Sequence, residues 1–520
     1  MLTLIYVYLL YYILHFFAFG MYKKAGKNPT HVFIPLVQDF TLMEIIGRPK
    51  KQAFWGLVPY VNFLFGLTWA TDFCNSFGKR SFLHHFVATF FGFIYFPFLG
   101  FADASTKYEG PSHTLDKEKK VKKSMVREWS DAILFAVVAA TIIRTFVIEA
   151  YKIPTTSLEG SLLEGDFLFV SKLNYGARTP ITPIAIPFFH HSISENKNNA
   201  YSKIIQLAYH RLPGFEKIER DDIVVFNYPG DAYGFPERPI DKRENYVKRC
   251  VGIPGDNLEI KNKEWYVNGV KHAHFSNMQF AYNVYVNKPF SIDALDQLKI
   301  DWYKDFKEWS FMDGMGSPIM PVDVCISKFN ELLYSTNHYK VLLNDSQLEA
   351  IKKSPNVDSV TNYNPLNEIY AQANPANSAL FPNDTMDMEN GGSIKLKWDL
   401  DNYGPINIPK KGEIITLTPD NIIFYYNIIT THERHTFTME NGQYIIDGKP
   451  TKTYTIQQDY YWMMGDNRHN SADSRYWGFV PESHIVGKPL FVWLSKDNFH
   501  SFFESIRWNR IFRSVSSLTK

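Results

Sequence analysis

Cysteine is scarce in this sequence, because only Cys74, Cys250 and Cys325 occur, far apart and without any C-x-x-C pair. That spacing supplies neither a disulfide framework nor a thiolate zinc site. The motifs G-x-x-x-x-G-K-[ST], H-E-x-x-H and G-x-S-x-G are also missing, which argues against nucleotide hydrolysis, zincin and α/β-hydrolase chemistry. Neither charge is in excess, since 55 Lys and Arg face 53 Asp and Glu. We therefore expect no metal, no cofactor and no nucleic-acid partner.

Apolar residues make up 45% of the 520 positions, and they are concentrated in the first 150. A chain of this length is expected to form several domains. An apolar run of about 20 residues is long enough to cross a membrane. Such runs predict spanning helices at Met1–Gly20, which has no charged side chain, and at Phe54–Ala70, Phe82–Phe101 and Trp129–Ile148. The shorter run Val32–Ile46 contains Asp39 and Glu44, so we interpret it as an interfacial or re-entrant helix.

Basic loops predict how these helices are oriented, because Lys and Arg in short loops stay on the cytoplasmic side. The loops after the first span and before the last span are both strongly basic. The loop Thr71–Ser81 carries only Lys79 and Arg80 and can lie outside. This pattern predicts four spans, with everything after about Ile148 outside the cytoplasm.

The rest of the chain changes to short β-type runs separated by Gly, Pro and Asp. Examples are Asp166–Leu173, Asp222–Tyr228 and Tyr246–Val251. These runs predict a mainly β domain. The pairs His432/His435 and His190–His191 match no strong metal-site spacing.

Four segments carry the most specific pattern in the sequence: Ile153–Leu163, Arg220–Pro229, Tyr246–Asp256 and Gly465–Pro481. In these segments the chain resembles the bacterial type I signal peptidases, or leader peptidases. These are membrane-bound serine proteases that remove signal peptides by a Ser–Lys dyad on a β-rich fold. The resemblance implies an N-terminal α-helical membrane domain followed by a mainly β signal-peptidase catalytic domain with a large insertion.

The resemblance makes Ser157 the nucleophile, although Gly160-Ser161 stands where the family has Pro-Thr. Ser161 is therefore a rival nucleophile on chemistry alone. A serine hydroxyl needs a base, and a lysine can serve only when burial disfavours its ammonium form. Lys248 lies in an apolar strand where such burial is plausible, which makes it the best candidate for the base. His469 is a weaker alternative.

Further site residues come from the resemblance alone. The backbone N–H of Ser157 and the hydroxyl of Thr155 are expected to stabilise the oxyanion. Ser471 is expected to hold the catalytic lysine in line, and Asp473 and Arg475 to form a buried salt bridge behind the site. The remaining residues expected to support the site are Asp466, Arg468 and Arg249.

The predicted organisation has five parts. Residues 1–128 form a multi-span membrane domain that resembles an uncharacterised domain found fused to signal peptidases, and residues 129–148 form the last transmembrane anchor. Residues 149–274 and 402–495 form the catalytic domain, which is interrupted by an insertion at 275–401. Asn262–Val270 and Asn441–Thr451 each predict a hairpin with an N-G or D-G turn. Residues 496–520 form a basic, aromatic tail that suits an interfacial or surface helix.

The resemblance implies a serine endopeptidase that cleaves preproteins after small residues, and the loop charges place this activity on the outer face of the membrane. The expected location is the bacterial inner membrane, as a multi-pass protein with its catalytic domain on the periplasmic side. The expected partners are preprotein signal peptides, membrane lipid and the protein export machinery. The competing interpretation is an inactive homologue that binds peptides or scaffolds an export complex, which the Gly160-Ser161 exchange and the insertion would suit.

Overall fold

The computed structural model describes residues 11–57, 61–114, 125–190, 199–230, 238–302, 305–306, 322–363, 380–382, 398–440, 442–497 and 504–519. The chain divides into two compact units. Unit 1 comprises Met1–Thr145 and Pro180–Ala208, and unit 2 comprises Phe146–Thr179 and Tyr209–Lys520.

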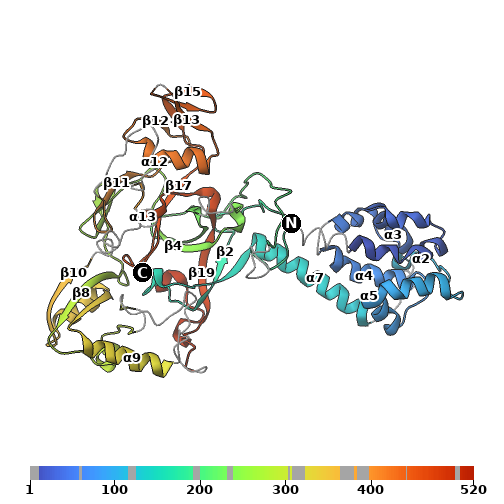
Figure 1. Cartoon of the computed structure of the whole chain (residues 1–520), viewed down its shortest axis with the longest axis horizontal. Helices are drawn as coiled ribbons and strands as arrows, with labels where there is room; N and C mark the ends of the chain where they lie inside the picture. The colour runs from blue at the N-terminus through green and yellow to red at the C-terminus, as the bar shows by residue number, and fades with distance from the viewer. Residues whose placement is uncertain are drawn as a thin grey trace. The chain divides into compact units, whose positions relative to one another are not determined.

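Unit 1 is helical, as its apolar runs predict (Figure 1). Its helices are α2 (Phe19–Lys24), α3 (Val37–Ile46), α4 (Val61–Asn75), α5 (Phe82–Pro97) and α7 (Met125–Phe146), with 3₁₀ helices η1 (Pro29–Phe33) and η2 (Lys50–Leu57). The Ser81 hydroxyl caps α5 by accepting the His84 N–H, as is usual for serine before a helix. Buried Tyr22, Trp69 and Phe73 contribute to the core of the unit.

Among the described residues, one helical segment has the length and hydropathy of a membrane span. This segment is Phe82–Ala102, which continues α5 into the π-helical turn η3 (Phe98–Ala102). Helix α4 has 15 residues, fewer than the roughly 20 that cross a hydrocarbon core. The predicted span Met1–Gly20 lies half outside the described residues. The helical character of this part is therefore confirmed, whereas the four-span topology stays a prediction.

Unit 2 is built on an antiparallel seven-stranded sheet with the strand order β1-β2-β19-β3-β4-β17-β18. Its strands are β1 (Ile148–Lys152), β2 (Asp166–Ser171), β3 (Ile223–Asn227), β4 (Asn245–Gly252), β17 (Tyr460–Met464), β18 (Val480–Pro481) and β19 (Ile485–Ser495). Strands β3 and β17 are buried at every position. Because β4 pairs with both of them, Lys248 stands opposite Val224 in the middle of the sheet. The predicted β-rich domain is confirmed.

The predicted insertion contains more β structure than its mixed helix and loop composition suggested. Strands β8 (Phe280–Val286), β9 (His338–Leu343) and β10 (Val357–Asn362) form a sheet in the order β10-β8-β9. The helices of this region are α8 (Ile292–Gln297), α9 (Val322–Ser335) and α10 (Asp345–Lys352). Composition missed the sheet because β10 is a polar, half-exposed edge strand with no apolar alternation.

The smaller sheets include both predicted hairpins. One sheet has the order β11-β5-β6-β7, with β5 (Asn257–Lys261), β6 (Glu264–Val267), β7 (Val270–Lys271) and β11 (Tyr403–Asn407). The others contain β12 (Ile414–Thr416) with β16 (Thr453–Thr455), and β13 (Phe437–Glu440), β14 (Gln443–Ile446) and β15 (Lys449–Thr451). Asn268-Gly269 and Asp447-Gly448 have positive φ at both turn residues, as a type I′ turn requires. Both hairpins are confirmed. Helix α12 (Ile422–Asn427) lies between β12 and β13, and α13 (Ser474–Trp477) lies between β17 and β18.

The tail is not the amphipathic helix that its basic and aromatic residues suggested. Its described part, Glu504–Thr519, which we call the closing segment, forms turns, a 3₁₀ turn at Trp508–Arg510 and the short helix α14 (Val515–Leu518). Arg507 pairs with Asp497 and Arg510 with Asp166, each at 2.7–2.8 Å. The arginines thus meet carboxylates of unit 2, which sequence periodicity could not show.

Candidate active site

Ser157 lies in a tight turn directly after β1, in the 3₁₀ helix η4 (Thr156–Leu158). Its side chain is buried, with 7% of the residue exposed. The loop after β17 holds this turn through three hydrogen bonds. The Asn467 N–H donates to the Ser157 carbonyl (3.1 Å), and the Asn467 amide donates to the Thr156 carbonyl (3.1 Å). The Asn470 amide donates to the Thr156 hydroxyl (2.9 Å), so the turn is fixed from one side.

Lys248 reaches the same point from the centre of the sheet. It lies on β4, and its Nζ is hydrogen-bonded to Ser157 Oγ. Burial lowers the pKa of Lys248 to about 8, although Asp473 and Asp466 act in the opposite direction. An amine with this pKa is partly neutral near physiological pH and can accept a proton. The structure therefore brings together the two residues that the sequence named as nucleophile and base.

Thr155 lies beside Ser157. Its hydroxyl Oγ1 lies 3.4 Å from Ser157 Oγ. Thr155 is exposed whereas Ser157 is buried. This position suits a hydrogen-bond donor to a developing oxyanion.

Ser471 lies close to the nucleophile turn but is not hydrogen-bonded to the lysine among the described residues. Its hydroxyl donates to the Ala472 carbonyl at 3.5 Å. Gly465 makes the close approach possible, because a Cβ on it would stand 2.3 Å from Ser471 Oγ and 2.4 Å from the Ser157 carbonyl oxygen.

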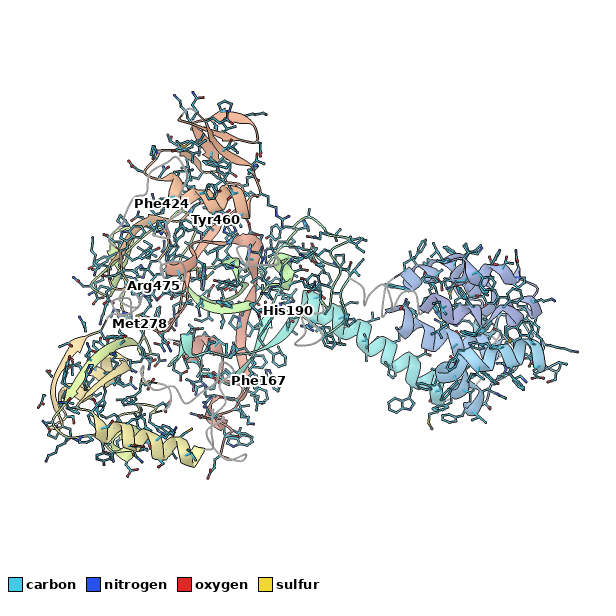
Figure 2. The ribbon with its side chains drawn as sticks, viewed as in Figure 1. Phe167, His190, Met278, Phe424, Tyr460 and Arg475 are labelled. Atoms are coloured by element: carbon cyan, nitrogen blue, oxygen red, sulfur yellow. The ribbon has the colours of Figure 1, made fainter. Side chains whose placement is uncertain are left out.

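Asp473 and Arg475 form a bidentate ion pair, with hydrogen bonds of 2.9 and 2.8 Å. Both residues are completely buried, and Arg475 is labelled inside the β-rich unit in Figure 2. Burial acts to raise the pKa of Asp473, but Arg475 outweighs it and holds that pKa below its ordinary value. The Asp473 carboxylate also accepts the Gly465 N–H at 3.2 Å, which ties the pair to the loop beside Ser157.

A second buried ion pair joins Arg249 to Asp466 through two hydrogen bonds of 2.8 and 2.6 Å. The Ser161 hydroxyl donates to the same Asp466 carboxylate at 2.6 Å. Ser161 is fully buried in this contact, so its hydroxyl is engaged away from the Lys248 amine. The geometry therefore favours Ser157 over Ser161 as the nucleophile.

The closing segment supplies site residues that sequence reasoning missed. The Thr519 carbonyl accepts from Arg249 (2.9 Å), and the Arg510 guanidinium donates to both the Ser161 carbonyl (3.0 Å) and the Asp166 carboxylate (2.7 Å). Asp166 follows Gly165 in the Ser157 segment and is completely buried. A conspicuous arginine in the tail was the available signal, but nothing in the sequence paired it with a particular carboxylate.

His469 and Arg468, two further candidate residues, contact neighbouring parts of the fold. His469 Nδ1 accepts the Ala281 N–H (3.1 Å), and Nε2 lies 2.8 Å from Asp401. Burial lowers the pKa of His469, and neither ring nitrogen faces Ser157. Arg468 lies over the ring of Trp265, with 4.2 Å between the guanidinium carbon and the ring centroid. Both residues support the loop after β17 rather than the reacting atoms.

Gly160, which stands where the family has proline, has φ +85°. Proline is restricted to φ near −65° and cannot adopt this conformation. A Cβ at position 160 would also lie 2.6 Å from the Asn277 carbonyl oxygen. At Gly160-Ser161 the backbone therefore follows a path that proline could not adopt. Asn277, at the start of the insertion, packs against this part of the turn.

No group of three or more His, Cys, Asp or Glu in the described part of the chain could hold a metal ion. The described site contains a buried serine hydroxyl hydrogen-bonded to a buried lysine amine, and the Thr155 hydroxyl lies next to them. Two buried ion pairs support the loop after β17. This set is suited to nucleophilic attack on an acyl carbon with lysine as the base.

Comparison with known proteins agrees with this chemistry. The sequence model of a family described as "Signal peptidase, peptidase S26" matches residues 126–302 and 410–494, just over half of the chain. A family of unknown function (DUF5684) matches residues 31–111.

Several curated proteins are similar over most of their length. Signal peptidase I of Buchnera aphidicola subsp. Acyrthosiphon pisum is 26% identical over 399 residues, covering 76% of this chain and 85% of the relative. The corresponding protein of Haemophilus influenzae is 23% identical, covering 77% and 78%. That of Helicobacter pylori is 24% identical, covering 74% and 91%.

These matches and the β-rich fold define a serine endopeptidase, a hydrolase. The chain belongs to the signal peptidase family, peptidase S26, and resembles the type I signal peptidases throughout the matched ranges.

Proposed function

We propose that this protein removes signal peptides from preproteins by a Ser157–Lys248 dyad. The observation that carries the proposal is the buried contact between Lys248 Nζ and Ser157 Oγ. The neutral amine accepts the Ser157 proton as Oγ attacks the scissile carbonyl. The proton then passes to the leaving amine, and a water activated by the same amine hydrolyses the acyl-enzyme.

The remaining residues have supporting roles in this proposal. The Ser157 N–H and the Thr155 hydroxyl stabilise the tetrahedral oxyanion. Ser471, Asp473 and Arg475 keep the amine and the loop after β17 in place, and Arg249, Asp466 and Arg468 support the turn from below. The retention of both buried ion pairs weighs against the inactive peptide-binding homologue, because a chain released from catalysis need not keep them.

The proposed substrates are preprotein signal peptides, in agreement with the relatives' name. The small residues before the cleavage site are what the resemblance to the type I signal peptidases implies. The proposed location is a bacterial inner membrane, with unit 2 on the periplasmic side and the export machinery as a neighbour. The apolar segment Phe82–Ala102 and the basic loops of the first 128 residues support this orientation.

The direct test is cleavage of a model preprotein by the purified full-length protein in detergent. We expect Ser157→Ala to eliminate cleavage, since no other hydroxyl contacts the Lys248 amine in the described structure. Ser161→Ala is the matched control and should keep a substantial part of the activity. The reverse pattern would transfer the nucleophile to Ser161 and overturn the proposed dyad.

A further inference from the structure

Unit 1 contains a cavity of about 170 Å³ that no part of the proposed protease mechanism uses. It lies among helical residues 11–22, α4 and α5. An apolar protein cavity of about 150 Å³ can bind a molecule such as benzene, so this one has room for a ring or a short length of hydrocarbon chain.

The cavity exists because small residues stand where helices usually present larger ones. Ala18, Gly66, Ala70, Ala88 and Gly92 all line it. A Cβ added at Gly66 would meet nothing closer than the Tyr11 ring, at 3.9 Å. There is free space beside Gly66, and a larger side chain at that position would fill it.

Two buried hydrogen-bond donors at the cavity have no partner among the described residues. They are Trp69 Nε1 and Thr89 Oγ1, and both residues line the cavity. Trp69 is only 1% exposed. An unpaired buried donor is unfavourable, and a ligand with an acceptor oxygen would remove that penalty.

The cavity is bordered by exposed aromatic residues of the candidate membrane span. Phe90 and Phe93 line it and are also 59% and 43% exposed. Both lie in Phe82–Ala102, the segment with the composition of a membrane span. A hydrocarbon chain could therefore enter between these aromatic rings without crossing water.

The polar residues near the cavity restrict the charge that the polar group of a ligand can carry. Tyr11, a lining residue, donates its hydroxyl to the buried Asp39 carboxylate at 2.7 Å. His15 also lines the cavity, with Nε2 3.8 Å from the same carboxylate. The described residues that line the cavity include no Lys or Arg, and His15 already faces Asp39. An anionic group would find no free cation among them, so the acceptor should be uncharged.

We propose that this cavity binds one acyl chain of a membrane glycerolipid, with the uncharged ester oxygens accepting from Trp69 and Thr89. The site gives unit 1 a lipid-binding role that is independent of the peptidase chemistry. The ester oxygens are the hydrogen-bond acceptors, and the acyl chain fills the apolar space. The exposed Phe90 and Phe93 would face the bilayer from which the lipid comes.

The test uses the full-length protein in nanodiscs containing phosphatidylglycerol with a photoreactive diazirine on one acyl chain. After irradiation and peptide mapping, we expect saturable labelling within residues 66–73 and 88–93, approaching one lipid per protein. Gly66→Leu should lower labelling of these residues at least fivefold and leave labelling of the outward Phe86 unchanged. The matched control is Ala136→Leu, at an exposed position of α7. This variant should show the same lipid labelling as the parent protein.

Two further measurements keep the outcome decisive. Thr89→Val, which removes a donor at nearly constant volume, should lower the labelling several-fold, and preprotein cleavage by both variants should equal that of the parent. A diazirine-bearing free fatty acid should label these residues weakly. Equal labelling of parent and Gly66→Leu, labelling without saturation, or stronger labelling by the free acid would each overturn the glycerolipid site.

Discussion

The amine of Lys248 determines how activity should depend on pH. Burial lowers its pKa to about 8, and only the deprotonated amine can accept the Ser157 proton. Cleavage should therefore be slow near pH 6, rise through pH 8 and level off above pH 9. The measurement is kcat/KM for a model preprotein between pH 6 and pH 10, which reports the pKa of the free enzyme.

The variant Lys248→Arg separates a base from a structural cation in the same assay. A guanidinium stays charged at any accessible pH and cannot accept the proton, so this variant should be inactive at every pH tested. Activity close to that of the parent would mean that Lys248 is a structural cation and that another group is the base.

At the scale of single residues, the sequence named candidates wherever a recognisable segment was present. Ser157 and Lys248 each lie in such a segment, and the structure places them in contact. The expected buried pair of Asp473 with Arg475 is also present. The pairing of Asp166 with Arg510, 344 positions apart, has no local signal, because it depends on how the strands return to one sheet. The unfamiliar Gly160 was visible in the sequence, but its positive φ was not.

Gly160 has the clearest expected effect among the turns. Replacing it by alanine places a Cβ in a left-handed conformation, which costs about 1–2 kcal/mol for the backbone alone. The contact with the Asn277 carbonyl adds to that cost. Gly160→Ala should lower both the thermal midpoint and the cleavage rate, as measured by scanning calorimetry and the preprotein assay.

The variant Gly160→Pro would restore the family's residue and should be worse than Gly160→Ala, because the ring excludes φ +85° altogether. The matched control is Gly255→Ala, also at positive φ but with only the Lys410 side chain within 4 Å. If Gly160→Pro were as active as the parent, the turn would not have the described path.

The contribution of the closing segment to stability and activity can be tested at Arg510. Arg510→Ala would leave the Asp166 carboxylate buried without its cation, and losing one partner of such a pair costs about 3–5 kcal/mol. We expect a large fall in the midpoint of denaturant unfolding and in cleavage. Arg513→Ala, three positions away at an exposed site, should change neither. Equal behaviour of the two variants would show that the segment does not support the site.

Elements with a local signature were predictable, and elements that depend on distant pairing were not. The N-G and D-G turns specify their hairpins through positive φ at adjacent residues. Strand β10 pairs with β8 across more than 70 positions, and its polar residues give no alternation. The closing segment was assigned to a helix because its arginines and aromatics resemble an amphipathic pattern, although tertiary ion pairs determine its path.

The predicted topology of the whole molecule can be tested with single cysteines. In a background without Cys74, Cys250 and Cys325, a cysteine at Lys120, outside the described residues, should react with a membrane-impermeant maleimide only after the cells are made permeable. A cysteine at Asn470 should react in intact cells, because the basic loops predict opposite sides. Exposed Ser516 is a second reporter for unit 2. Labelling of both positions from one side would refute the topology.

The long-range contacts of the closing segment also have a consequence in time. The Arg249 guanidinium donates to the Thr519 carbonyl across 270 positions, and the Arg510 guanidinium donates to the Ser161 carbonyl across 349. During translation the ribosome therefore makes Ser157 long before it makes the residues whose contacts hold the surrounding segment. If Ser157 is the nucleophile proposed above, we expect the nascent chain to be inactive until residue 519 has been synthesised and has packed against Arg249. The growing chain would then be unable to cut its own apolar segments during membrane insertion.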